Sequence, residues 1–295
     1  MRPIAPGQAA PLWFVDAVAQ VPESGSVEVL GAQIAWRAWG DTRLPGVVLV
    51  HGAGGNSRWW DHIGPLLASD HRVVALDLSG HGDSAWRDEY GLDVWAQEIR
   101  GAWRVAGGSG PWTVVGHSMG GFPALKVGTR AESSLKAVVC VDSAVRDVPD
   151  PAIQRRHAVA AKPRSRYASA AEATSRFRLV PSQPALAYVT DHIAAHSVRE
   201  RDGTWGWKFD SRIFTRESQS LALLEGLTVP VAFLNGEFGL VGPEIDAQVR
   251  ERVPPGTPMV RIPQAGHHCM LDQPIALVTA LRCLVAVQGT GRRVG

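Results

Sequence analysis

Ser118 is the residue of this sequence that is best placed to act as a nucleophile. It lies at the centre of a Gly-x-Ser-x-Gly turn, from Gly116 to Gly120, between an apolar strand-like run and a helix-like segment at Phe122–Ala131. Such a turn holds the serine in a strained backbone that exposes its hydroxyl above a sheet. A Cβ on either glycine would collide with the neighbouring strand or helix. The pattern therefore predicts a serine nucleophile at a strand-to-helix turn.

A base must accompany this serine, because its hydroxyl is a poor nucleophile until its proton is removed. The base is expected late in the chain, in the order serine, acid, histidine. Of the ten histidines, His267 is the best placed, since it follows the last predicted strand and the flexible Gly266. We prefer it to its neighbour His268. A histidine there can reach back over the carboxyl edge of the sheet and act as general base and then general acid.

Two backbone N–H groups are needed to bind the oxyanion that forms when a carbonyl is attacked. We assign one to Met119, which follows the nucleophile at the start of a helix. The other is assigned to Ala53 in the glycine-rich loop His51–Asn56, which follows a predicted strand. Glycines in that loop allow the backbone to approach a substrate closely.

The elements that must position these residues alternate between short β-rich runs and longer helical patterns. Several strands are continuous Val, Leu and Ala runs, as expected for strands buried on both faces of a parallel sheet. The alternation predicts an α/β fold with a doubly wound, mostly parallel sheet. Strands are predicted at 26–30, 33–39, 47–51, 72–76, 112–116, 136–141, 229–235 and 258–262, and helices at 61–68, 92–105, 122–129, 244–252 and 274–287.

The alternation stops between Ala144 and about Ser218, where helical, Ala- and Arg-rich segments replace buried strands. An insertion of this length between two sheet strands predicts a separate helical cap. We therefore divide the chain into a first core part at 1–144, a cap at 145–218 and a second core part at 219–295. The segments at 2–23 and 289–295 are expected to be loosely held ends.

Four motifs together resemble the α/β-hydrolase superfamily. They are His51-Gly52-Ala53-Gly54-Gly55 followed by Trp59-Trp60, the run Leu76–Ser84, the serine turn, and Ala265-Gly266-His267. The sequence is most similar to the capped branch of epoxide hydrolases, haloalkane dehalogenases, carbon–carbon bond hydrolases and lactonases. This resemblance covers roughly residues 26–287 and implies the α/β-hydrolase fold with an inserted helical cap. Epoxide hydrolases and haloalkane dehalogenases use an aspartate nucleophile, so Ser118 argues against their chemistry.

The sequence departs from the superfamily at the acid that should orient the histidine. Most members carry an aspartate in a Gly-x-x-Asp turn after the strand that corresponds to 229–235, where this chain has Gly239. Three interpretations are open: the acid is Asp142 after the predicted strand at 136–141, or Glu237 in the usual loop, or there is no working triad. We favour Asp142, because only the geometry of a triad matters and some dehalogenase-like and lactonase-like members resemble this arrangement.

Tryptophans are the candidates for a substrate pocket. Trp59 and Trp60 follow the oxyanion loop, and Trp205 and Trp207 lie near the return from the insertion, so all four are expected to line an apolar pocket. The predicted function is a serine hydrolase that cleaves an ester, lactone or related carbonyl bond of an apolar small molecule through an acyl-enzyme. In this reaction, Asp142 would hold the imidazolium of His267. The alternatives are a carbon–carbon bond hydrolase with the same residues and a non-catalytic or slow-turnover ligand receptor.

Composition excludes several other classes of protein. The 295 residues are 45% hydrophobic and 20% charged, which is typical of a globular protein, and a net charge of +2 argues against a nucleic-acid partner. No apolar run reaches the ~18–20 residues of a membrane span, and the N-terminus lacks a secretory apolar core, so a cytoplasmic location is expected. The three cysteines and the other ligand residues show no metal spacing, so neither a metal nor a cofactor is expected. The expected partner is a small-molecule substrate, and a homo-oligomer is compatible with the sequence.

Overall fold

The computed structural model describes residues 9–147, 154, 157–158, 160–161, 165–215 and 221–290. The predicted boundary at 218, parts of the predicted cap and residues 291–295 of the loose end expected at 289–295 lie outside these residues. We call residues 165–215 the insertion. Among the described residues, no helix combines the length and apolar character that a membrane crossing requires.

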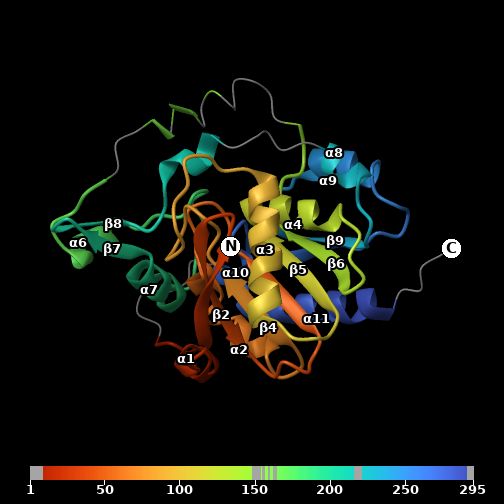
Figure 1. Ribbon diagram of the computed structural model, residues 1–295, viewed down its shortest axis with the longest axis horizontal. Helices are drawn as coiled ribbons and strands as arrows, with labels where there is room; N and C mark the ends of the chain where they lie inside the picture. The colour runs from red at the N-terminus through yellow and green to blue at the C-terminus, as the bar shows by residue number, and fades with distance from the viewer. Residues whose placement is uncertain are drawn as a thin grey trace.

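An eight-stranded sheet forms the centre of the molecule, in the order β1-β2-β4-β3-β5-β6-β9-β10 (Figure 1). Strand β2 runs antiparallel to β1 and β4, and the other described neighbours in this sheet run parallel. The prediction of a mostly parallel sheet is therefore confirmed. The strands span β1 Glu23–Val29, β2 Ala32–Trp39, β3 Gly46–Val50, β4 Arg72–Leu76, β5 Trp112–His117, β6 Leu135–Val141, β9 Val231–Phe238 and β10 Met259–Gly266.

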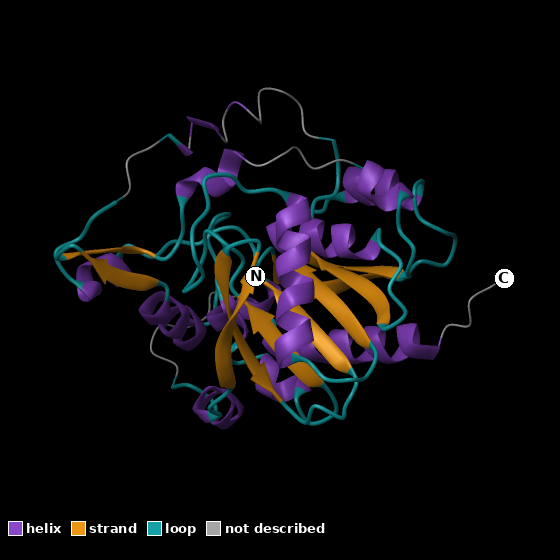
Figure 2. Cartoon of the chain, viewed as in Figure 1, coloured by secondary structure: helices purple, strands orange, loops and turns teal. Residues whose placement is uncertain are grey.

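Helices cover both faces of this sheet, which confirms the doubly wound architecture (Figures 1 and 2). One face packs against α3 (Leu92–Ala106), α4 (Gly121–Gly128), α8 (Ala222–Glu225) and α9 (Pro243–Arg250). The other face packs against α1 (Leu12–Ala19), α2 (Gly64–Leu67), α10 (Cys269–Asp272) and α11 (Pro274–Thr290).

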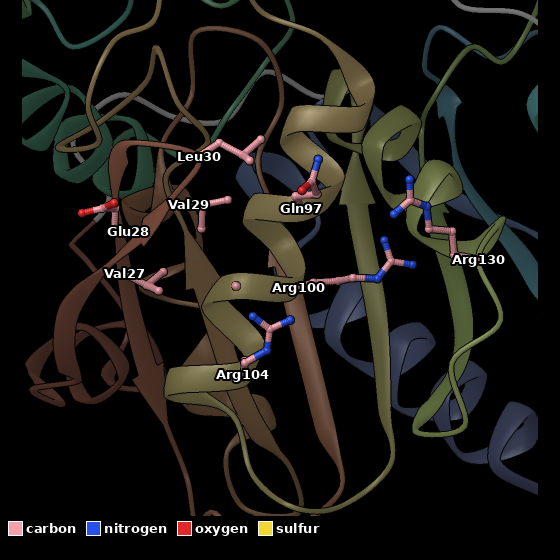
Figure 3. Close-up of a pocket in the computed structure, with 9 residues that line it drawn as sticks. Val27, Glu28, Val29, Leu30, Gln97, Arg100, Arg104 and Arg130 are labelled. Atoms are coloured by element: carbon pink, nitrogen blue, oxygen red, sulfur yellow. The ribbon is translucent and has the colours of Figure 1, made fainter.

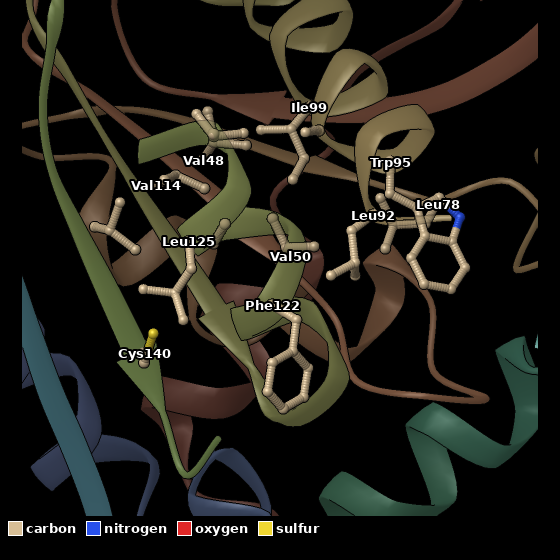
Figure 4. Close-up of a cluster of buried hydrophobic side chains, with 14 of the residues drawn as sticks. Val48, Val50, Leu78, Leu92, Trp95, Ile99, Val114, Phe122, Leu125 and Cys140 are labelled. Atoms are coloured by element: carbon tan, nitrogen blue, oxygen red, sulfur yellow. The ribbon is translucent and has the colours of Figure 1, made fainter. Parts of the chain in front are cut away.

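The central strands are continuous apolar runs because alternate residues enter two different cores. In β3, Val48 and Val50 belong to the cluster on the α3–α4 face, and Val47 and Leu49 belong to the cluster on the opposite face. Figure 4 shows the first cluster, with Val48 and Val50 beside side chains from α3 and α4. Successive side chains of a strand point to opposite faces, so every position of such a strand must be apolar.

The N-terminal segment differs from the expectation of a loose end. Residues Leu12–Ala19 form α1, and β1 already begins at Glu23. Phe14 is only 5% exposed, and its ring centroid lies 4.8 Å from that of Tyr188 in the insertion. The run Leu-Trp-Phe-Val at 12–15 is the signal that could have predicted a packed helix, since burying such side chains is favourable.

The insertion is not wholly helical. It contains the helices α6 (Ala170–Ser175) and α7 (Ala187–His196) and a 3-10 turn, η3 (Ser211–Thr215). It also contains an antiparallel hairpin of β7 (Val198–Arg201) and β8 (Thr204–Trp207), which the prediction missed because neither strand is deeply buried. The hairpin turns at Asp202-Gly203, where both residues have positive φ, and Asp-Gly is a common sequence signal for such a turn.

Replacing Phe14 by Ala tests whether α1 is part of the folded structure. We expect Phe14→Ala to lower the free energy of unfolding by about 3–5 kcal/mol, as for other buried phenylalanines. Chemical denaturation followed by fluorescence measures the change. The control is Leu12→Ala in the same helix, because Leu12 is 79% exposed and its loss should change stability by less than about 0.5 kcal/mol. Equal midpoints for the two variants would contradict the packed helix.

Candidate active site

Ser118 lies directly after β5 at the start of the 3-10 turn Ser118–Gly120, which leads into α4. Its φ of +52° is in the left-handed region, where a serine is strained. A Cβ on Gly116 would overlap the backbone of Gly120, and a Cβ on Gly120 would overlap the carbonyl groups of Val50 and His51. These close approaches account for both glycines of the predicted serine turn.

His267 and Asp142 lie together as the sequence predicts. His267 Nδ1 donates a hydrogen bond to Asp142 Oδ2 over 2.6 Å, and the two side chains are 3% and 0% exposed. His267 follows β10 and Asp142 follows β6, with β9 between these two strands. The aspartate therefore reaches across the end of β9 to the histidine. Asp142 has a φ of +44°, a second strained residue at this edge of the sheet.

The Asp142 carboxylate is held by the turn that carries the acid in most of the superfamily. Oδ1 accepts a hydrogen bond from Gly236 N at 3.1 Å, and Oδ2 accepts one from Leu240 N at 2.8 Å. A Cβ on Gly239 would overlap the carboxylate of Asp142. The glycine at the usual acid position is thus the residue that leaves room for the aspartate from β6.

Glu237, the second acid that we considered, is directed elsewhere. Its side chain is exposed, and its Oε2 accepts a hydrogen bond from the backbone N–H of Gln264 at 2.7 Å. Asp142, rather than Glu237, is the carboxylate that the structure places on the imidazole of His267.

The predicted oxyanion loop, His51–Asn56, lies against Ser118. A Cβ built on Gly52 would be 3.2 Å from the Cβ of Ser118, so this loop and the serine turn are in close contact. Ala53 follows in the loop, and Met119 is the residue after the serine, at the first turn of a helical segment. The first N–H groups of a helix have no partner within it, which leaves them free to bind an anion.

Two further imidazoles surround His267. The ring centroids of His117 and His268 lie 4.8 Å and 4.6 Å from that of His267. Burial, and after it the charge of the neighbouring His267, lowers the pKa of His117 well below its ordinary value and lowers the pKa of His268 to about 3. Both rings are therefore neutral at neutral pH. The three residues offer nitrogen atoms within 4.8 Å of one another, a donor set that suits a transition metal such as zinc.

The four tryptophans predicted to line a pocket lie in different places. Trp60 is fully buried in the core cluster that includes α2 and α11, so its side chain has no surface with which to contact a ligand. Trp59 lies 5.4 Å from His268 between ring centroids, at the edge of the site. Phe177 links Trp207 to Trp59, since its ring centroid lies 5.9 Å from that of Trp207 and 6.4 Å from that of Trp59.

Trp205 has a different neighbour. It is half-buried, and its backbone pairs with that of Tyr167. Among the described residues, the ring contacts link Trp207 but not Trp205 to the side chains beside His268. The Trp-Trp pair lies on a 3-10 turn, η1 (Ser57–Trp60), which places its two side chains in different surroundings.

A groove of about 350 Å³ lies away from these residues, between β1 and α3 (Figure 3). Three arginine side chains border it, and Gln97 is also part of its lining (Figure 3). Arg100 is already engaged, because its guanidinium pairs with Glu132 at 3.2 Å. No residue predicted for catalysis or for the pocket lines this groove. Its lining is Val27, Glu28, Val29, Leu30, Gln97, Arg100, Gly101, Arg104 and Arg130.

Two polar residues beside His267 were not found from the sequence. Asp272 Oδ2 accepts a hydrogen bond from Gly266 N at 2.6 Å, and burial raises the pKa of Asp272 to about 6. Gln183 belongs to the insertion and bonds to both His268 and Asp272. Because Asp272 follows His267 closely in the sequence, its position could have indicated that it lies beside this histidine. Nothing in the sequence around Gln183 points to this loop.

The fold and a match to a family model define the class of protein. The chain belongs to the alpha/beta hydrolase family, whose sequence model matches residues 47–281. It is 28% identical over 279 residues to "Esterase Rv0045c" of Mycobacterium tuberculosis, an alignment that covers 89% of each chain.

Solved structures of low sequence identity share the fold. The thioesterase domain from the curacin biosynthetic pathway has a TM-score of 0.75 at 23% identity, covering 89% of this chain and 100% of that chain. E-2-(acetamidomethylene)succinate hydrolase has a TM-score of 0.77 at 20% identity, covering 90% of this chain and 99% of that chain.

A methyl group at position 239 tests the space that Asp142 occupies. We expect Gly239→Ala to lower the free energy of unfolding by about 1–3 kcal/mol, because the new Cβ must displace the buried carboxylate or the turn that holds it. Thermal and chemical unfolding measure the change. Gly242→Ala is the matched control, since a Cβ there meets nothing within 4 Å. If the two variants are equally stable, the close contact at Gly239 does not exist.

Proposed function

We propose that this protein is a serine hydrolase that cleaves an ester, lactone or related carbonyl bond of an apolar small molecule through an acyl-enzyme. The observation that carries the proposal is the hydrogen bond between His267 and the fully buried Asp142, at the same carboxyl edge of the parallel strands as a serine in a strained turn. The similarity to a mycobacterial esterase over most of both chains supports the same class of reaction.

The first half of the reaction is attack by Ser118 Oγ on the substrate carbonyl. His267 takes the hydroxyl proton through Nε2, since its Nδ1 is bonded to Asp142. The carbonyl oxygen becomes an oxyanion, which the N–H groups of Ala53 and Met119 bind. The imidazolium then gives its proton to the leaving oxygen, the bond to that oxygen breaks, and an acyl group remains on Ser118.

The second half reverses these roles with water in place of the serine. His267 removes a proton from a water molecule as the water oxygen attacks the acyl carbon. A second oxyanion forms in the same backbone site, and the imidazolium returns the proton to Ser118 Oγ as the ester bond breaks. The products are a carboxylic acid and regenerated enzyme. A lactone would give a hydroxy acid by the same steps.

Asp142 has two tasks in this mechanism. Its bond to Nδ1 keeps the Nε2 side of the imidazole free to face Ser118, and its negative charge stabilises the imidazolium that forms twice in each turnover. The backbone donors at Gly236 and Leu240 satisfy the carboxylate, so it stays in place as the charge on His267 changes. A relocated acid can perform both tasks, because neither depends on the strand from which it comes.

The insertion supplies the proposed apolar surface and belongs to the cap that we predict at residues 145–218. Phe177 and Trp207 continue from Trp59, and Phe209 lies 3.7 Å from the position of a Cβ on Gly54 in the oxyanion loop. Aromatic side chains around a few polar groups are typical of sites for small apolar ligands. The insertion therefore favours an apolar acyl or alcohol group over a polymer.

A non-catalytic ligand receptor is less well supported than an enzyme. The main argument for a receptor was the absence of an acid at position 239. The carboxylate of Asp142 occupies the space that a side chain at Gly239 would fill. The glycine is thus consistent with a complete triad.

Labelling with a fluorophosphonate tests the nucleophile. We expect the wild-type protein to be labelled at Ser118, because His267 activates its hydroxyl, and we expect Ser118→Ala to abolish both the labelling and the hydrolysis of p-nitrophenyl esters. Mass spectrometry of the labelled peptide identifies the site. Ser143→Ala is a matched control, since its buried hydroxyl bonds to backbone carbonyls near the same turn and should not be needed. A folded wild-type protein that takes up no label would refute the proposal.

Asp142→Asn tests the acid. We expect kcat for p-nitrophenyl ester hydrolysis to fall by roughly 10²–10⁴-fold with little change in KM, because the amide neither selects the correct tautomer of His267 nor stabilises its positive charge. Glu237→Gln alters the other candidate acid at the same edge of the sheet, and it should leave kcat within about twofold of the wild-type value. The opposite pattern would assign the triad acid to Glu237.

A further inference from the structure

A side chain of the insertion forms hydrogen bonds to the loop that carries His267. We infer that Gln183 is a positioning residue for His267, so that docking of the insertion sets the orientation of the catalytic imidazole. This inference rests on the proposed function, because it assigns Gln183 a role in the same reaction.

Gln183 uses both ends of its amide on this loop. Its Oε1 accepts a hydrogen bond from His268 N at 2.7 Å, and its Nε2 donates to Asp272 Oδ2 at 2.9 Å and to His268 O at 3.4 Å. The amide packs so closely that a Cβ on Gly266 would lie 2.8 Å from its Cδ. Gln183 therefore contacts the residue before His267 and the residue after it.

Asp272 completes the arrangement from the other side of the loop. The same Oδ2 that accepts from Gln183 also accepts from Gly266 N at 2.6 Å. The N–H groups that flank His267 thus bond to two side chains, Asp272 before it and Gln183 after it. These two side chains also bond to each other. We call the three residues Gln183, Gly266 and Asp272 the histidine clamp.

The backbone needs such a clamp because the strand before His267 is irregular. The register of β10 against β9 shifts between Ile262 and Gly266, and Gln264 has a φ of +60°. The sheet ladder alone does not fix the direction in which His267 leaves the strand. The hydrogen bond from the imidazole to Asp142 does not by itself fix the backbone from which the ring projects. The clamp fixes the backbone from which the ring projects.

Glutamine suits this position because it must both donate and accept. A glutamate would place a second carboxylate about 2.9 Å from Asp272, and two carboxylates this close repel each other unless one is protonated. Alanine would leave the N–H of His268 and the carboxylate of Asp272 without this partner. An unpaired buried polar group is unfavourable, so the loop would move to recover hydrogen bonds.

The test compares Gln183→Ala and Gln183→Glu with His192→Ala. His192 provides a matched control, because it also joins the insertion to the core, through a 3.0 Å bond to Asp61, but does not touch the histidine loop. We expect both Gln183 variants to lose about 10–100-fold in kcat for p-nitrophenyl ester hydrolysis, with KM within about twofold of wild type. We expect His192→Ala to keep kcat within about threefold. Circular dichroism checks that each variant is folded.

A second readout follows the imidazole without turnover. The Nδ1 proton of His267 in its short bond to Asp142 should give a strongly downfield proton NMR resonance, which we expect to shift or broaden in Gln183→Ala and to stay unchanged in His192→Ala. Asp142→Asn identifies the resonance by removing it. This readout remains informative if the wild-type protein is not labelled by fluorophosphonate, in which case the proposed function fails but the clamp is still tested.

Three results would overturn the inference. One is an unchanged kcat in Gln183→Ala together with an unchanged resonance. A second is a rise in KM alone, which would make Gln183 a substrate contact. The third is an equal loss of kcat in His192→Ala, which would mean that any loosening of the insertion has the same effect. A loss of kcat and a perturbed resonance confined to the Gln183 variants would support the clamp.

Discussion

A fully buried carboxylate must be given hydrogen-bond donors, because leaving its charge without partners in the protein interior is very unfavourable. Asp142 obtains its donors from the ends of two other strands: backbone N–H groups at Gly236 and Leu240 near the end of β9, and the imidazole of His267 after β10. The aspartate itself follows β6. The order and register of these three strands therefore determine whether the acid and the base can meet.

Three glycines at this edge of the sheet allow functional groups to approach closely. Gly239 adjoins the carboxylate, Gly266 adjoins the amide of Gln183, and Gly52 adjoins Ser118. In each place a Cβ would fall within contact distance of a polar group that the site uses. The glycines here serve close approach of functional groups, while the strain in the backbone is carried by Ser118 and Asp142, whose φ angles are positive.

The parts of this site that follow from local sequence could be predicted, and those that depend on distant packing could not. Ser118 and His267 stand in short motifs whose strand, turn and helix context is visible in the chain. Asp142 could be proposed because it ends a recognisable strand. The structure adds the reason for Gly239.

Other features depend on which segments meet in space. Gln183 lies 85 residues before His268, in a segment whose residue pattern does not show what it packs against. Trp60 and Trp59 are neighbours in sequence, yet only packing decides that the first is fully buried in the core. The central strands of the sheet could be predicted because they are continuous, buried runs of mostly apolar residues. The β7–β8 hairpin was missed because its strands are short and not deeply buried.

Helix α1 has a consequence for any attempt to alter specificity by exchanging the insertion with that of a relative. Its Trp13 and Phe14 contact Tyr188, and Phe14 also contacts His192, so an aromatic cluster joins the start of the chain to α7. On the core side, Phe14 reaches His62. The unit that can be transplanted as one piece is therefore discontinuous in sequence: a new insertion would have to be accompanied by its own N-terminal helix.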